Sequence, residues 1–209
     1  MKLKLLVRKI ELSKEKFTIA NTIKNHCKYL GLNYSEAVNY LLRHKYIVRI
    51  LRGIFYIKSI EERKLNKTEI NIFSAIKKAL EIKKINNWYF GLETALKLNN
   101  MTHEYYTIDF LVTDCLFRPK PVKIIGHKVK FVKIKKKMFS FGIIKSGINY
   151  SDPEKTILDI AYLERYNGSD ESKIKKNISE YLPKVSKNKI KNYLKFYPST
   201  IKRITEELL

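Results

Sequence analysis

The first third of the chain carries hydrophobic residues at helical spacing. Leu3, Leu6 and Ile10 recur at positions i, i+3 and i+7, which places them on one face of a helix. Gly31, which suits a left-handed helix end, follows a second set with this spacing. The members of the second set are Ala20, Ile23, Cys27 and Leu30. The pattern therefore predicts two helices before residue 32.

A third helix is predicted directly after them. Asn33 and Glu36 have the spacing of a capping box, with asparagine in place of the usual serine or threonine. An inward apolar stripe follows at Ala37, Val38, Leu41 and Leu42. Ser35, Asn39 and Arg43 lie at i, i+4 and i+8 and therefore share one exposed face.

The next segment, YIVRILRGIFYI at residues 46–57, has the composition of a β-hairpin. Its strand-forming residues flank Arg52 and Gly53, and glycine there allows the positive φ that a tight turn requires. Three helices and a two-stranded hairpin predict a winged helix-turn-helix domain over residues 1–58. Such domains bind DNA or dock proteins, and the pattern alone leaves both readings open.

Polar side chains on the third helix and hairpin are candidates for DNA contact. Asparagine and arginine pair with base edges in the major groove, which makes Asn39 and Arg43 candidate base-reading residues. Ser35 and Tyr40 have hydroxyls for phosphate or base, and Arg49 and Arg52 have charges for the backbone or minor groove. The predicted DNA-binding residues are Ser35, Asn39, Tyr40, Arg43, Lys45, Arg49 and Arg52.

Residues 59–87 are interpreted as a connecting segment. Asn66 and Glu69 again have capping-box spacing, and an amphipathic helix follows. Its apolar residues are Ile72, Phe73, Ile76, Ala79 and Leu80.

Residues 88–209 predict a mixed α/β domain with a helical C-terminus, so the whole chain is expected to be α+β. The expected order is a short helix around 91–98, a strand around 105–112, a hairpin turning at Gly126 and His127, and one strand within FGIIKSGINY. Ser151 and Glu154 then have capping-box spacing at the start of a helix, and two or three more helices follow to the end.

The net charge of the chain limits the kinds of partner that we expect it to bind. The chain has 43 lysines and arginines against 20 aspartates and glutamates, a formal charge of +23. Residues 1–58 hold 13 basic and 3 acidic side chains, and residues 88–150 hold 11 and 4. Because this many positive charges repel one another unless an anion neutralises them, we expect nucleic acid as the leading partner and a membrane surface as the second candidate. The later block predicts a secondary basic patch at Lys128, Lys130, Lys135, Lys136 and Lys137, although a lysine-rich solvated surface has the same composition.

Membrane insertion and secretion have little support. No apolar run approaches the roughly 20 residues that a bilayer requires, and charge interrupts MKLKLLVRKIEL repeatedly. We therefore expect a cytoplasmic protein. Cys27 and Cys115 are too few for a disulfide framework and are expected in the core.

Catalytic motifs are missing from the sequence. It contains no glycine-rich phosphate loop, no G-x-S-x-G and no histidine-rich metal motif. A metal-dependent nuclease would need acids and a lysine on neighbouring strands, for which Glu93, Asp109 and Lys128 or Lys130 are the available set. No acid directly precedes a lysine on the following strand. The sequence therefore predicts no enzyme, no metal and no cofactor.

The succession of segments resembles the AbiEi family of antitoxins and transcriptional regulators. A basic winged helix ending in RILRGIFYI is followed by WYFGLETALKLNNMTHEYYTI, a hairpin leading to FGI, and SDPEKTILDIAYL. The similarity runs over roughly residues 10–165. It implies a DNA-binding repressor of its own promoter, acting at inverted repeats, and an antitoxin that counters a nucleotidyltransferase-like toxin without a stable complex. A nuclease targeted by the winged helix and an RNA- or ribosome-binding protein are the alternatives.

Overall fold

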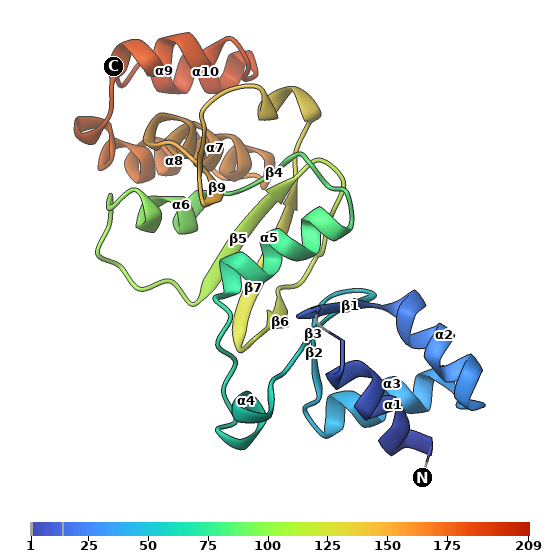
Figure 1. Ribbon diagram of the computed structural model, residues 1–209. Helices are drawn as coiled ribbons and strands as arrows, with labels where there is room; N and C mark the ends of the chain where they lie inside the picture. Colours follow the sequence, from blue (N-terminus) through green and yellow to red (C-terminus); the bar gives the residue numbers. More distant parts are fainter. Residues whose placement is uncertain (1, 14) are drawn as a thin grey trace. The chain divides into compact units, whose positions relative to one another are not determined.

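The computed structural model describes residues 2–13 and 15–209 and has an α+β fold, as expected (Figure 1). These residues form ten α-helices, two short 3-10 helices and two β-sheets. The chain divides into two compact units, Met1–Lys84 with Lys123–Gly126, and Ile85–Val122 with His127–Leu209. None of the helices in the described ranges is long and apolar enough to cross a membrane.

The first unit contains five helices and a three-stranded antiparallel sheet in the order β1-β3-β2. Its strands are β1 (Phe17–Ile19), β2 (Ile47–Leu51) and β3 (Ile54–Ile57). Its helices are α1 (Lys2–Glu11), α2 (Ala20–Leu30), α3 (Tyr34–Arg43), α4 (Ile60–Lys64) and α5 (Ile72–Ile82). β1 and α4 are additions to the predicted elements, and both are too short to show a hydrophobic period in the sequence.

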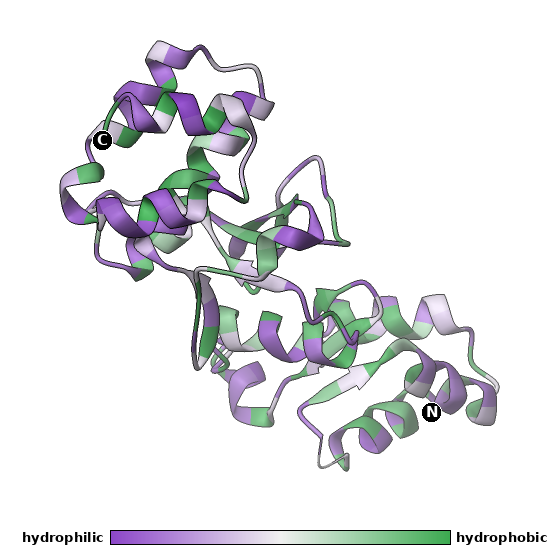
Figure 2. Cartoon of the chain, turned by 90° about the horizontal axis from the view of Figure 1, so that it is seen from above, coloured by the Kyte–Doolittle hydropathy of each residue, from purple (hydrophilic) through white to green (hydrophobic). Residues whose placement is uncertain are grey.

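The predicted apolar faces of α1, α2 and α3 are buried in one core. Hydrophobic residues recur along these helices between hydrophilic ones (Figure 2). The buried members of this core are Leu6, Val7, Ile10, Ile23, Cys27, Ala37, Val38, Leu41, Ile47 and Phe55. Gly31 ends α2 in the left-handed conformation, as predicted.

The hairpin between β2 and β3 is tied to the start of α2. Its loop consists of Arg52 and Gly53, and Gly53 has φ +79° as predicted. The Ala20 amide donates a hydrogen bond of 2.8 Å to the Gly53 carbonyl. The tip therefore satisfies one of the amides that a helix start leaves unpaired.

The predicted start of the helix after Asn66 is wrong. Asn66 itself has φ +51° and follows the end of α4, whereas the Asn71 side chain caps α5 by accepting from the Phe73 amide. The capping box in this segment belongs to α4, where Ser59 and Glu62 bond each other's backbone amides.

The second unit contains a six-stranded mixed sheet in the order β6-β7-β5-β4-β9-β8. Lys123–Gly126, which include part of β6, are grouped with the first unit. Its strands are β4 (Trp88–Phe90), β5 (Ile108–Thr113), β6 (Val122–Ile124), β7 (His127–Lys133), β8 (Ile143–Ser146) and β9 (Ile148–Ser151). The helices are α6 (Leu92–Leu98), α7 (Pro153–Tyr166), α8 (Glu171–Ser179), α9 (Lys187–Leu194) and α10 (Ser199–Glu206). The 3-10 helices are η1 (Lys136–Phe139) and η2 (Leu182–Lys184).

Three details of the predicted second domain need correction. FGIIKSGINY contains two strands, β8 and β9, which turn at Gly147, and not one. Ser151 lies in β9, and the side chain that caps α7 is that of Asp152, which accepts from the Lys155 amide at 2.8 Å. Cys115 is exposed, so only Cys27 is a core cysteine.

A buried charged pair joins α7 to the rest of the second unit. Lys155 is fully buried, and its Nζ lies 3.3 Å from Asp159 Oδ1 and 4.2 Å from the centroid of the Phe141 ring. The hydroxyls of Tyr89 and Tyr197 each donate a 2.7 Å hydrogen bond to Asp159. Burial lowers the pKa of Lys155, and Asp159 partly offsets this effect.

A second group of polar contacts lies next to this pair. Asp152 Oδ2 accepts from the Tyr193 hydroxyl at 2.9 Å and pairs with Lys189 Nζ at 2.9 Å. Gly142 packs so closely that an added Cβ would lie 2.7 Å from Lys155 Cβ, and its φ is +62°. The start of α7, the segment before β8 and the last helices are thus fixed together.

We predict that Asp159→Asn lowers the free energy of unfolding at pH 7 by about 3–5 kcal/mol, because it leaves a buried ammonium without its counter-charge. A buried, unpaired Lys155 has a lowered pKa, so the folded state loses its proton before the unfolded state does. Stability should therefore recover as pH rises from that lowered pKa toward the ordinary value of 10.5. Denaturant unfolding between pH 7 and 10 measures both effects.

Glu171→Gln is the matched control. Glu171 pairs with Arg203 in a half-exposed ion pair, so its loss should lower stability far less than the loss of Asp159. An Asp159→Asn protein as stable as this control at pH 7 would contradict the assigned role of the buried pair.

Candidate nucleic-acid interface

The exposed face of α3 has the composition expected of a base-reading surface. Ser35, Asn39 and Arg43 are all exposed on it, one turn apart. The start of the helix is fixed by Asn33, whose Oδ1 accepts from the Ser35 amide at 2.9 Å and the Glu36 amide at 3.2 Å. Asn33 is therefore confirmed as the cap of α3, through the half of the predicted capping box that its own side chain supplies.

Tyr40 differs from the other three because its ring belongs to an aromatic cluster. It is half-buried, and its centroid lies 4.3 Å from that of His44 and 6.1 Å from that of Tyr46. His44 is exposed and forms the C-cap of α3. Neither His44 nor Tyr46 was among the residues predicted from the sequence. His44 lies outside every predicted element, and Tyr46 was expected only as the first residue of the hairpin segment, whereas both lie in the turn between α3 and β2.

The remaining predicted cations lie in the turn and the hairpin. Lys45 has φ +59°, and its Nζ donates to Asn66 Oδ1 at 2.8 Å. Arg49 on β2 is exposed, with its guanidinium carbon 5.7 Å from the Phe55 ring centroid. Arg52 is exposed at the hairpin tip. The Lys45 ammonium is therefore held by a hydrogen bond within the protein. In the described ranges, Arg52 has no such polar partner.

Arg63, on α4, contacts the turn that follows α3. Its guanidinium carbon lies 4.6 Å from the Tyr46 ring centroid, and its Nη2 pairs with Glu11 on α1. Nε donates to the Ser59 carbonyl at 3.3 Å. The sequence pattern predicted only a connector here and gave no sign of Arg63, because its ion pair with Glu11 joins residues 52 positions apart.

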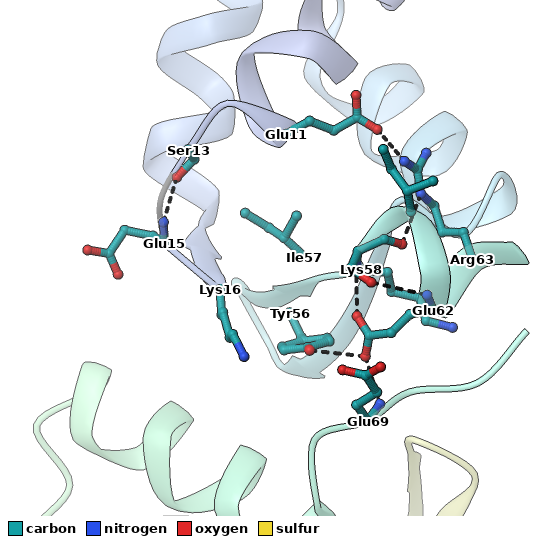
Figure 3. A pocket seen from close by; sticks show the side chains of 12 residues that line it. Glu11, Ser13, Glu15, Lys16, Tyr56, Ile57, Lys58, Glu62, Arg63 and Glu69 are labelled. Carbon is teal, nitrogen blue, oxygen red and sulfur yellow. Dashed lines mark hydrogen bonds and ion pairs between the residues drawn. The ribbon is translucent and has the colours of Figure 1, made fainter. Parts of the chain in front are cut away.

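A pocket of about 230 Å³ lies beside Arg63 (Figure 3). Glu62 is buried in its wall and accepts from the Tyr56 hydroxyl at 3.0 Å and the Glu69 amide at 2.7 Å. Burial, followed by the hydrogen bond to Glu62, raises the pKa of Tyr56 above its ordinary range. Lys58 lines the same pocket, and burial lowers its pKa. Interactions within the protein thus occupy much of this wall.

The secondary basic patch consists of two parts. Lys128 is exposed on β7, while Lys130 is half-buried and donates to the Pro119 carbonyl. Lys135 precedes η1, and Lys136 and Lys137 lie in it, all three exposed. The lysine run therefore has defined backbone geometry, although its side chains are free to solvate.

The acids considered for a nuclease lie in different surroundings. Glu93, on α6, has a raised pKa, mainly because of burial and secondarily because of Glu164. Asp109 Oδ2 lies 3.5 Å from His127 Nδ1, and burial raises its pKa while His127 lowers it. Within residues 2–13 and 15–209, no three His, Cys, Asp or Glu side chains are grouped so that they would hold a metal ion.

Comparison with known proteins defines the fold only. No protein-family model and no curated protein matches the chain. Among solved structures, it is similar to the RV2827C protein from Mycobacterium tuberculosis, with a TM-score of 0.58 and 10% sequence identity. That similarity covers 100% of this chain and 76% of the other. At this identity the likeness concerns the arrangement of elements and carries no function.

We predict that Asn33→Ala lowers the free energy of unfolding by about 1 kcal/mol, because the first turn of α3 loses its side-chain acceptor. Asn33→Asp should retain the stability, since aspartate caps equally well. Asn25→Ala, at an exposed position inside α2, is the control and should be neutral or slightly stabilising. Equal stability of the two alanine variants in thermal unfolding would contradict the role of the cap.

Proposed function

We propose that the protein is a sequence-specific DNA-binding repressor whose first unit is a winged helix-turn-helix domain. The element order α1-β1-α2-α3-β2-β3, with β1 beside β3, supports this reading because α2 and α3 form the helix pair and β2–β3 the wing. The observation that carries it is the exposed row of Ser35, Asn39 and Arg43 on α3 within a segment of 13 basic and 3 acidic residues.

In this proposal α3 enters the major groove. Asn39 and Arg43 meet base edges, and Ser35 at the helix start donates to phosphate or base. Arg52, at the short tip tied to α2, contacts the backbone, and Arg49 reaches the backbone or the minor groove. The exposed lysines of the second unit, Lys128 and Lys135–Lys137, add a sequence-independent attraction to phosphate.

The biological role rests on the resemblance to AbiEi regulators. It favours repression of the protein's own promoter at inverted repeats and, through the second unit, protection against a nucleotidyltransferase-like toxin without a stable complex. Variants of the α3 face should therefore relieve repression and leave protection intact. An assay that measures promoter activity and survival of toxin expression in the same cells separates the two roles.

A nuclease remains the competing function from another class. Plasmid DNA incubated with the protein and Mg²⁺ or Mn²⁺ should stay intact if the protein is a repressor. Cutting that is lost in an Asp109→Asn variant would replace our proposal with the nuclease.

Salt provides the first test of DNA binding. If about 5 phosphates are neutralised, the logarithm of affinity should fall with the logarithm of salt concentration with a slope of roughly −4 to −5. Binding of a labelled duplex between 50 and 300 mM KCl measures the slope. A flat response would remove duplex DNA from the proposal.

Substitutions then test which side chains read sequence. Arg43→Ala, and less strongly Asn39→Ala, should lower affinity for an inverted repeat upstream of the protein's gene and leave random duplex nearly unchanged, since a bidentate base contact gives about 1–3 kcal/mol of discrimination. Arg52→Ala should weaken both, because a phosphate contact carries no sequence information. Footprinting and competition with random duplex measure the ratio.

Arg165→Ala, at an exposed position on α7, removes the same charge from the second unit and serves as the control. Full operator specificity in Arg43→Ala, or unchanged affinities in Arg52→Ala, would contradict the assignment of this surface.

A further inference from the structure

The aromatic cluster at the end of α3 continues into a cation that is held from a different part of the chain. Tyr40 packs on His44 and Tyr46, and the guanidinium carbon of Arg63 lies 4.6 Å from the centroid of the Tyr46 ring. Tyr40 and His44 belong to the last turn and cap of α3, the turn that also carries Arg43. The cluster therefore joins α4 to the part of α3 that is proposed to read bases.

The backbone around Tyr46 makes this connection short. The Tyr46 amide donates to the Leu41 carbonyl at 2.9 Å, and the Tyr46 carbonyl accepts from the Lys58 amide at 2.9 Å. Tyr46 is thus fixed to α3 on one side and to the end of β3 on the other. The Tyr46 main chain is therefore held in place, and its ring contacts the rings of Tyr40 and His44.

Arg63 is oriented by three different groups. Glu11 on α1 pairs with Nη2, the Ser59 carbonyl accepts from Nε, and the guanidinium carbon lies over the Tyr46 ring (Figure 3 shows the contact with Glu11). A planar guanidinium satisfies an ion pair and a ring stack together, which an ammonium does not. The side chains of Arg63 and Glu11 retain 19% and 34% of their exposure, so the pair faces solvent and is not part of the core.

We propose that Arg63 is a positioning residue for DNA recognition. It touches no base in this proposal. It holds Tyr46 and thereby the Tyr40 and His44 rings that pack on it, and so fixes the last turn of α3, where Arg43 must meet a base edge. This inference rests on the proposed function, because it concerns how the same surface achieves its specificity.

The decisive variant is Arg63→Lys, which keeps the charge and loses the planar stack. The probe is the duplex that the full-length wild-type protein selects from a random pool, compared with random duplex. Because base contacts need placement within about 0.5 Å whereas phosphate contacts depend mainly on charge, affinity for the selected duplex should fall about fivefold to tenfold and that for random duplex by less than about twofold. The salt slope should stay at its wild-type value.

Companion variants separate positioning from general stability. Tyr46→Phe keeps the ring and should behave like wild type, whereas Tyr46→Leu should reproduce the loss of specificity. Arg203→Lys changes an arginine of the second unit that also pairs with two glutamates, and it should alter neither affinity. Thermal unfolding of each variant shows whether a loss of specificity occurs without a loss of folding.

Three results would overturn the inference in different ways. Unchanged affinity for the selected duplex in Arg63→Lys would show that Arg63 positions nothing. An equal loss on both duplexes with a smaller salt slope would make Arg63 a phosphate contact. Failure of the wild-type protein to bind any duplex would refute the proposed function itself, which the variant data alone would not do.

Discussion

The carboxylate of Asp159 is the constraint on which the second unit depends. It accepts hydrogen bonds from a tyrosine of β4 and from Tyr197, which follows α9, and it balances the buried ammonium of Lys155 on its own helix. A buried ion pair alone is a weak source of stability, because desolvation offsets much of the attraction. Here the additional hydroxyl donors satisfy the carboxylate. They also make the sheet and the terminal helices meet α7 at one fixed point.

The first unit has a strongly basic surface, and contacts within the unit hold several of its cations in place. Its core is apolar, and several of its cations are held by neighbours: Lys45 by Asn66, Arg63 by Glu11 and Tyr46, and Lys9 over the ring of Tyr29. Arg43 and Arg52 have no such partners in the described ranges. Two of the proposed DNA contacts are thus among the cations that the fold leaves available.

Periodicity predicted the elements that are long enough to have a period. The faces of α1, α2 and α3, the β2–β3 hairpin and the C-terminal helices agree with the structure, as does the Asn33 cap. Errors occurred where several polar residues competed to cap one helix. Asn71 replaced Asn66, and Asp152 replaced Ser151, because the residue next to the first helical turn holds the favourable geometry. β1 is fixed by its pairing with β3, which single-sequence patterns do not contain, whereas α4 begins at the local Ser59–Glu62 capping box.

The candidate site also combines residues that the sequence pattern predicts with residues that it does not. Its exposed row on α3 follows from helical spacing, whereas His44, Tyr46 and Arg63 come together only through the folded chain.

The hydrogen bond between the Gly53 carbonyl and the Ala20 amide has a consequence for how this surface can evolve. The two-residue loop has no spare length, because its tip also accepts the hydrogen bond from the first amide of α2. An inserted residue would withdraw the acceptor and expose an unpaired helix amide, so the hairpin cannot lengthen without loosening the helix that supports α3. Variation in this hairpin must therefore arise by exchange of its side chains and not by a change in its length.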